Sequence, residues 1–132
     1  MHPKKLENIL SMSADDRYWY CIRTVADAEE VWLSAMSSGS PLTIEMAPGT
    51  LVYPIWPERE FAEAAARERP EWGPVNAMSL PLDEFMERWL PGMQRDGHKV
   101  GVFWVGPDLL GIDVEPAVLL QDLKEARAQH EE

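Results

Sequence analysis

The sequence has one cysteine, no long apolar run and few basic side chains, and each shortage excludes a class of protein. A lone Cys21 cannot form an intrachain disulfide, so we expect a fold independent of oxidation and a reducing, cytoplasmic location. The apolar runs are far shorter than the ~20 residues of a membrane helix, and none follows the basic start of the chain as in a secretory signal. Twelve Lys and Arg against 23 Asp and Glu give a net charge of −11, which argues against nucleic-acid or membrane binding.

The composition is that of a soluble domain with a packed core. The chain has 132 residues, 45% of them hydrophobic, and contains six tryptophans. A chain of this length buries enough surface to fold without a metal ion or a disulfide. Neither a linker nor a repeat is found, and acidic residues are spread evenly. We therefore expect one domain over residues 1–132, with an ordered core at about 11–128 and frayed termini.

Apolar spacing and turn residues predict helices and strands in the order α-βββ-αα-ββ-α. The expected fold is α+β, with a mainly antiparallel sheet of about five strands and helices packed on it. Pro54 cannot donate to a ladder, which places its strand at an edge or at a bulge. The predicted helices are 14–26, 57–69, 81–95 and 116–129, preceded by a short helical turn at 3–10, and the predicted strands are 31–36, 42–46, 51–56, 99–105 and 110–114.

The helix that begins near Pro81 has a complete apolar stripe that includes Trp89. Pro91 lies inside it and predicts a kink or an interruption, because the proline ring clashes with the carbonyl group four residues earlier. We expect Trp89, and Trp104 of the strand 99–105, to lie in the core. The strand 99–105 is apolar on both faces and is therefore expected in the interior of the sheet.

Reactive groups are few. His98, in a turn with Asp96, is either a solvated side chain or a general base that Asp96 orients. Cys21 lies on the apolar side of a predicted helix and is either an inert core residue or a nucleophile. No metal-ligand pattern and no phosphate-binding glycine loop occur in the sequence. We therefore expect no catalytic residue, no metal site and no cofactor.

Two acidic segments and two tryptophans form the candidate partner-binding set. Trp56 and Trp72 are either core residues or exposed recognition residues. If the helices 57–69 and 81–95 face each other, their carboxylates would surround Trp72. The alternative is that these carboxylates only occupy first helical turns, where the helix dipole favours them. The set comprises Trp56, Glu58, Glu60, Glu63, Trp72, Asp83, Glu84 and Glu87.

The sequence resembles the bacterial domain-of-unknown-function family 2750 over roughly residues 11–125. The resemblance implies a small cytoplasmic α+β domain and brings no catalytic residues with it. The segment 34–51, which is rich in Ser and Pro, departs from the pattern. The matching residues are Trp56-Pro57-x-x-Glu60-Phe61-Ala62, Trp72, Phe85-x-x-x-Trp89-Leu90-Pro91-Gly92, Asp96-Gly97, Glu115-Pro116 and the stretch from Ser13 to Trp32.

The leading functional hypothesis is a non-catalytic protein-interaction module, an acidic inhibitor or immunity-type partner of a basic protein. It depends on the net charge of −11, the tryptophan content and the lack of a reactive cluster. One alternative is a small-molecule sensor or enzyme with a pocket near Trp56 and Trp72. Another is a structural domain with no specific ligand.

Overall fold

The computed structural model describes residues 1–106, 108 and 110–131, and its elements follow the predicted order with one strand added. That strand, β4, was predicted as part of a loop. The elements are α1 (Pro3–Leu10), α2 (Ala14–Ala28), β1 (Glu30–Met36), β2 (Ile44–Ala47), β3 (Thr50–Ile55), α3 (Arg59–Glu68), the 3₁₀ turn η1 (Pro70–Trp72), β4 (Val75–Pro81), α4 (Leu82–Glu84), the π-helical turn η2 (Phe85–Trp89), α5 (Leu90–Asp96), β5 (Lys99–Val105), β6 (Leu110–Val114) and α6 (Pro116–Glu131).

Local sequence explains where α2 begins and ends. The Ser13 hydroxyl accepts a hydrogen bond from the Asp16 N–H at 3.1 Å, so the predicted cap is present. Glu29 ends the helix in the left-handed conformation, with φ at 56°, and its N–H donates to the Val25 carbonyl group at 2.8 Å. At the other end of the chain, α6 runs to Glu131, and Glu132 and Pro107 lie outside the described residues.

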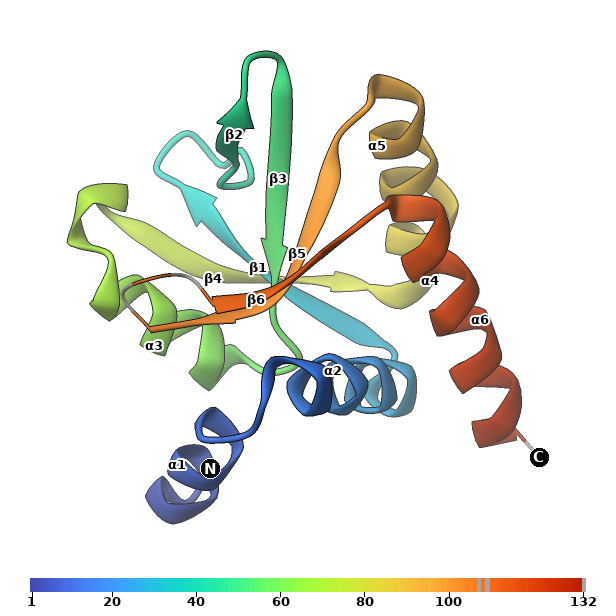
Figure 1. Cartoon of the computed structure of the whole chain (residues 1–132), viewed down its shortest axis with the longest axis horizontal. Coiled ribbons are helices and arrows are strands. Elements are labelled where there is room, and N and C mark those ends of the chain that lie inside the picture. Colours follow the sequence, from blue (N-terminus) through green and yellow to red (C-terminus); the bar gives the residue numbers. More distant parts are fainter. Residues whose placement is uncertain (107, 109, 132) are drawn as a thin grey trace.

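The strands form two sheets instead of the single sheet expected (Figure 1). One contains β1 and β4 in antiparallel pairing, and the other has the order β2-β3-β5-β6. The first strand therefore pairs with β4 and not with β2, the next strand along the chain. The pairing is antiparallel throughout except between β3 and β5, which run parallel. The interior position predicted for residues 99–105 is confirmed.

Pro54 lies in a strand that has neighbours on both sides, which corrects the expected edge position. The pairing of β2 with β3 reaches only as far as Val52, where Ile44 is its partner. Pro54 lies beyond that point and pairs only with Gly101 of β5. A proline is accepted there because no β2 carbonyl group lies opposite its missing N–H.

The predicted interruption of the long helix is present just before Pro91. The Leu90 N–H donates to the Phe85 carbonyl group, five residues back, and so closes the π-helical turn η2. Pro91 has no N–H to continue the α-helical pattern, and the wider turn absorbs this defect. Trp89, expected in the core, packs against it but is only half-buried, whereas Trp104 is buried as predicted.

Helices cover the sheets from several sides, and one core joins them. In Figure 1, α3 lies at the left, α1 and α2 below, and α4, α5 and α6 at the right. No helix in the described part of the chain is long and apolar enough to cross a membrane. The largest fully buried side chains include Trp56, Trp104, Phe61, Phe85 and Phe103.

Candidate protein-binding surface

Trp56, a predicted contact residue, is completely buried and is excluded as a surface contact in this structure. Its indole Nε1–H donates to the Trp104 carbonyl group at 2.9 Å. The residue follows β3, at the place where the two sheets meet, and its ring fills the space between them. The core alternative left open by the sequence therefore holds for Trp56.

Trp72 is half-buried in η1, and its ring centroid lies 6.4 Å from that of Trp56. It packs against the core at the C-terminal end of α3, whereas Glu58 and Glu60 lie at the N-terminal end. Trp72 is thus not at the centre of the carboxylates expected around it. A pocket was expected near Trp56 and Trp72, but neither residue lines the two hollows described below.

The two acidic segments are brought to different sides of the molecule (Figure 1). Strand β4 connects η1 to α4 and has seven residues, which span about 23 Å. It therefore carries Asp83, Glu84 and Glu87 away from Glu58, Glu60 and Glu63. The condition that the helices 57–69 and 81–95 face each other across a short loop is therefore not met.

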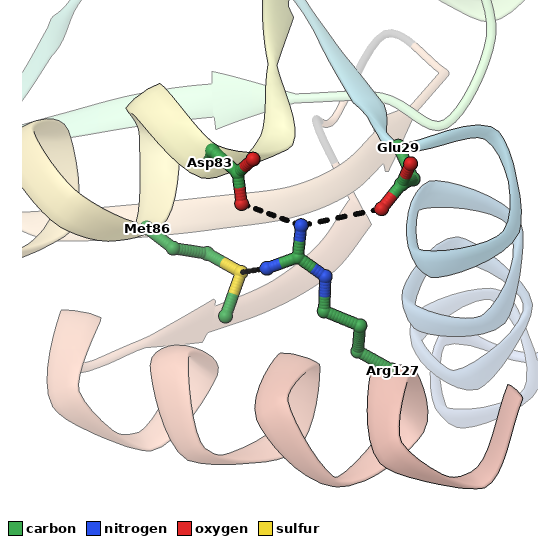
Figure 2. Close-up of polar contacts among 4 residues, drawn as sticks. All are labelled: Glu29, Asp83, Met86 and Arg127. Carbon is green, nitrogen blue, oxygen red and sulfur yellow. Dashed lines mark hydrogen bonds and ion pairs between the residues drawn. The ribbon is translucent and has the colours of Figure 1, made fainter. Parts of the chain in front are cut away.

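On the α4 side, Asp83 is already engaged within the chain (Figure 2). Arg127 of α6 donates from Nη2 to Asp83 at 2.5 Å and to Glu29 at 3.2 Å, and its Nη1 lies 3.8 Å from the Met86 sulfur. The hydrogen bond to Asp83, followed by that to Glu29, raises the pKa of the Arg127 guanidinium above its ordinary value. Arg127 thereby ties α6 to α4 and to the end of α2.

The carboxylates of α3 contribute to a different site, centred on Trp32. A hollow of about 380 Å³ is lined by Glu30, Trp32, Glu58, Arg59 and Glu60, and we call it the Trp32 hollow. The Arg59 guanidinium carbon lies 5.0 Å from the centroid of the half-buried Trp32 indole, within cation–π range. Three Glu against one Arg give its side chains a formal charge of −2.

The carboxylates of the Trp32 hollow are held by neighbouring groups. The Tyr20 hydroxyl donates to Glu58 Oε1 at 2.6 Å, and the Met1 amino group lies 3.5 Å from Glu60 Oε2. Burial, followed by the bond to Glu58, raises the pKa of Tyr20 to about 12. The hollow thus already contains one cationic group of its own chain, the Arg59 guanidinium, and the Met1 amino group pairs with one of its carboxylates.

A larger groove of about 750 Å³ adjoins the Trp32 hollow and shares Glu30 and Glu58 with it. It runs between α2 and α6, and its polar lining carries charges of both signs. The charged residues along it are Lys5, Arg23, Asp27, Glu30 and Glu58.

Neither residue considered for catalysis lies in this region. His98 Nδ1 accepts a hydrogen bond from the Leu51 N–H at 3.1 Å, so the ring connects a turn to β3 and is not oriented by Asp96. Cys21 is fully buried, and burial raises the pKa of its thiol, which disfavours the reactive thiolate. Among the described residues, no group of three or more His, Cys, Asp or Glu is placed to hold a metal ion.

Trp32 is the site residue that sequence reasoning missed. It belongs to a short, mostly apolar strand, where a tryptophan is usually a core residue. The structure leaves it half-buried, with Arg59 of α3 over its indole. The sequence offered one signal, the Glu58-Arg59-Glu60 triplet, which places a cation between two carboxylates.

Comparisons with known proteins show the family and carry no further functional argument. No curated protein matches the chain significantly. A solved structure titled Anabaena Tic22 (protein transport) is similar at a TM-score of 0.43 and 16% identity, covering 63% of this chain. This chain spans 44% of that protein's length. A family model described as a protein of unknown function, DUF2750, matches residues 18–123, which confirms the resemblance seen in the sequence. The chain therefore belongs to the DUF2750 family.

Proposed function

We propose that the chain is a non-catalytic binding module that recognises a basic segment of another protein at the Trp32 hollow. The observation that carries this proposal is the arrangement of Glu30, Glu58 and Glu60 around one half-buried indole. An aromatic face within a ring of carboxylates suits a Lys or Arg side chain, because the cation gains both a cation–π contact and charge-assisted hydrogen bonds. The Arg59 contact with Trp32 is an example of that chemistry within the chain.

The charge of the whole chain supports the same proposal. A net charge of −11 attracts a basic protein from a distance and speeds its association, while it repels nucleic acids and anionic membranes. If the partner binds nucleic acid through a basic surface, this acidic module would cover that surface. The role proposed in the cell is therefore that of an inhibitor or immunity-type partner of a basic protein.

Peptide binding tests the Trp32 hollow directly. The probe is a short synthetic peptide of alternating lysine and valine, titrated into the wild type and into single variants. We expect Trp32→Leu to weaken binding by about tenfold, through the lost cation–π contact. Glu60→Gln should weaken it by about two- to fivefold, as expected for one partly exposed ion pair.

Glu63→Gln is the matched control for Glu60→Gln. Glu63 is exposed on the same helix and outside the Trp32 hollow, so its loss removes the same charge and the same steering without touching the site. If the two variants weaken peptide binding equally, the peptide is attracted by the negative charge of the whole protein, and the assignment of the Trp32 hollow as the binding site is wrong. Binding of the wild type should also weaken between low and physiological salt, since exposed charges are screened.

The adjoining groove favours a second candidate, the binding of a small polar ligand. Its volume of about 750 Å³ lies within the range of ligand pockets. Its charged lining, however, matches the apolar character of such pockets poorly. Thermal unfolding tests this second candidate. The melting temperatures of the wild type and of Arg23→Gln are measured with a panel of anionic and zwitterionic metabolites. A ligand that contacts Arg23 should raise the melting temperature of the wild type more than that of the variant.

A further inference from the structure

We infer that the basic segment binds in an extended conformation as an added strand along the free edge of β4, and inserts one Lys or Arg side chain into the Trp32 hollow. This inference deepens the proposed function and rests on it. Strand addition supplies affinity through main-chain hydrogen bonds, while pockets for alternate side chains supply specificity. The structure places such an edge and such a pocket on adjacent strands.

Strand β4 lies at the edge of a two-stranded sheet and carries no charged side chain. Asn76, Ser79 and Pro81 along it are exposed. Natural proteins usually protect an exposed edge with charged residues. The edge strands of the other sheet follow that rule, since β2 contains Glu45 and β6 contains Asp113. The uncharged edge of β4 is thus suited to pairing with another strand.

The hydrogen bonds of β1 show which β4 groups point outward. The Trp32 N–H and carbonyl group bond to Trp56, and the Ser34 carbonyl group accepts from the Leu42 N–H, so both residues direct these groups away from β4. Their partners across the ladder are Ser79 and Ala77. In an antiparallel pair, residues alternate between bonded and non-bonded positions. The N–H and carbonyl groups of Ala77 and Ser79 therefore face the open side of β4.

The same register connects this edge to the Trp32 hollow. Trp32 and Ser79 are directly opposite, so their side chains project from the same face of the sheet. A residue of an added strand opposite Ser79 would project from that face too, about 9–10 Å from the Trp32 backbone, which is two strand spacings. Ser79, beside Trp32 on this face, is exposed and has a small side chain. A long Lys or Arg side chain that passes over Ser79 would extend toward the indole and Glu60.

Charge decides between a basic segment and a second copy of this chain. Two copies would each bring a net charge of −11 to the shared edge, and their repulsion opposes pairing. A basic segment reduces the charge instead. A segment with lysine or arginine at every second position presents these side chains on the face of Trp32 and leaves its main chain free to pair with Ala77 and Ser79.

Amide hydrogen exchange with the lysine–valine peptide is the first test. In the free protein the Ala77 and Ser79 amides should exchange as open groups, and the peptide should slow their exchange by at least about tenfold. The Met78 amide, which faces β1 on the same strand, should change far less and is the internal control. A peptide with N-methylated amides on its β4 side should bind about three- to tenfold more weakly for each lost hydrogen bond.

Substitutions in β4 are the second test. Ala77→Pro removes an outward donor and leaves the pairing with β1 intact, so the variant should fold and bind the peptide at least about threefold more weakly. Ala77→Ser is the control, since it keeps the N–H and should bind as the wild type does. If Ala77→Pro fails to fold, the exchange experiment on the wild type decides alone.

The outcomes separate the two proposals. If the peptide binds in a manner that depends on Trp32 while the Ala77 and Ser79 amides stay unprotected, strand addition is wrong and the proposed function stands. If the peptide does not bind, both are wrong. If the two amides are protected in the free protein and the protection rises with its concentration, a second copy occupies the edge, and the inference is overturned.

Discussion

The main chains of Trp32 and Trp56 exchange two hydrogen bonds, with N···O distances of 3.0 and 2.8 Å. This bridge joins β1 to the residue that follows β3, so it connects the two sheets. The two tryptophans that it joins differ in the burial of their side chains. The Trp56 side chain is directed into the core, where it is fully buried, while that of Trp32 reaches the surface beside Glu58 and Glu60.

Trp56→Ala should lower the free energy of unfolding by about 3–5 kcal/mol, because it leaves a large cavity between the sheets. It also leaves the Trp104 carbonyl group without its indole donor. Trp89→Ala, at a half-buried position, should lower it by only about 1–2 kcal/mol. Urea unfolding followed by circular dichroism measures both, and equal losses would contradict the burial seen in the structure.

Glycine is required beneath the Trp104 ring at two positions. A Cβ at Gly101 would lie 2.4 Å from Trp104 Cε2, and one at Gly111 would lie 2.5 Å from Trp104 Cδ1 and 2.8 Å from the Val102 carbonyl oxygen. Trp104 cannot move freely, because its Nε1–H donates to Asp113 at 2.7 Å. Gly101→Ala and Gly111→Ala should therefore each destabilise the protein by about 1–3 kcal/mol.

Gly92→Ala is the matched control for this pair. A Cβ at Gly92 meets only Arg95 Nη2, at 3.7 Å, and the residue lies in a helix. Alanine is favoured over glycine in a helix by up to about 1 kcal/mol. Gly92→Ala should therefore raise the urea midpoint while the other two substitutions lower it. A stabilised Gly111→Ala variant would show that Trp104 does not pack as described.

Cys21 should resist thiol reagents in the native protein. It is fully buried, and burial raises the pKa of its thiol, so the thiolate is both scarce and inaccessible. Labelling with a chromogenic disulfide reagent should be slow without denaturant and should rise in parallel with urea unfolding. Fast labelling of the folded protein would mean that α2 opens locally and that Cys21 is not a core residue.

Alkaline pH should destabilise the protein through α2. The pKa of Tyr20 is raised to about 12 from an ordinary value of 10.0, by burial and by the bond to Glu58. Burial also raises the pKa of Tyr18 and Cys21. Because the folded state holds these protons more tightly, this stability is complete below the unfolded pKa values and is lost as pH rises through the folded ones.

The free energy of unfolding should accordingly fall between about pH 10 and 12, measured by urea titration across that range. Tyr20→Phe removes one of the contributing groups and should make the fall less steep. The substitution also removes the hydrogen bond to Glu58, which lowers stability at neutral pH as well. The quantity to compare is therefore the slope of unfolding free energy against pH, and not the free energy itself. An unchanged slope in Tyr20→Phe would contradict the raised pKa of Tyr20.

Local patterns determined most of the secondary structure. The Ser13 cap and the apolar spacing that follows predicted α2, and the apolar run 99–105 predicted β5 at its observed bounds. The interruption before Pro91 follows from the missing N–H of one residue. These features depend on neighbours in the chain, and so they can be inferred without knowledge of the tertiary structure.

Tertiary structure alone decided how the strands pair and which tryptophans reach the surface. The segment 75–81 has little periodicity of its own and becomes β4 because β1 offers it a partner along seven residues. Once β4 forms, it carries the two acidic segments apart, and the fold buries the Trp56 indole completely but the Trp32 indole only in part. Composition determined the net charge of −11. The site depends on contacts between residues distant in sequence, whose energies no local pattern contains.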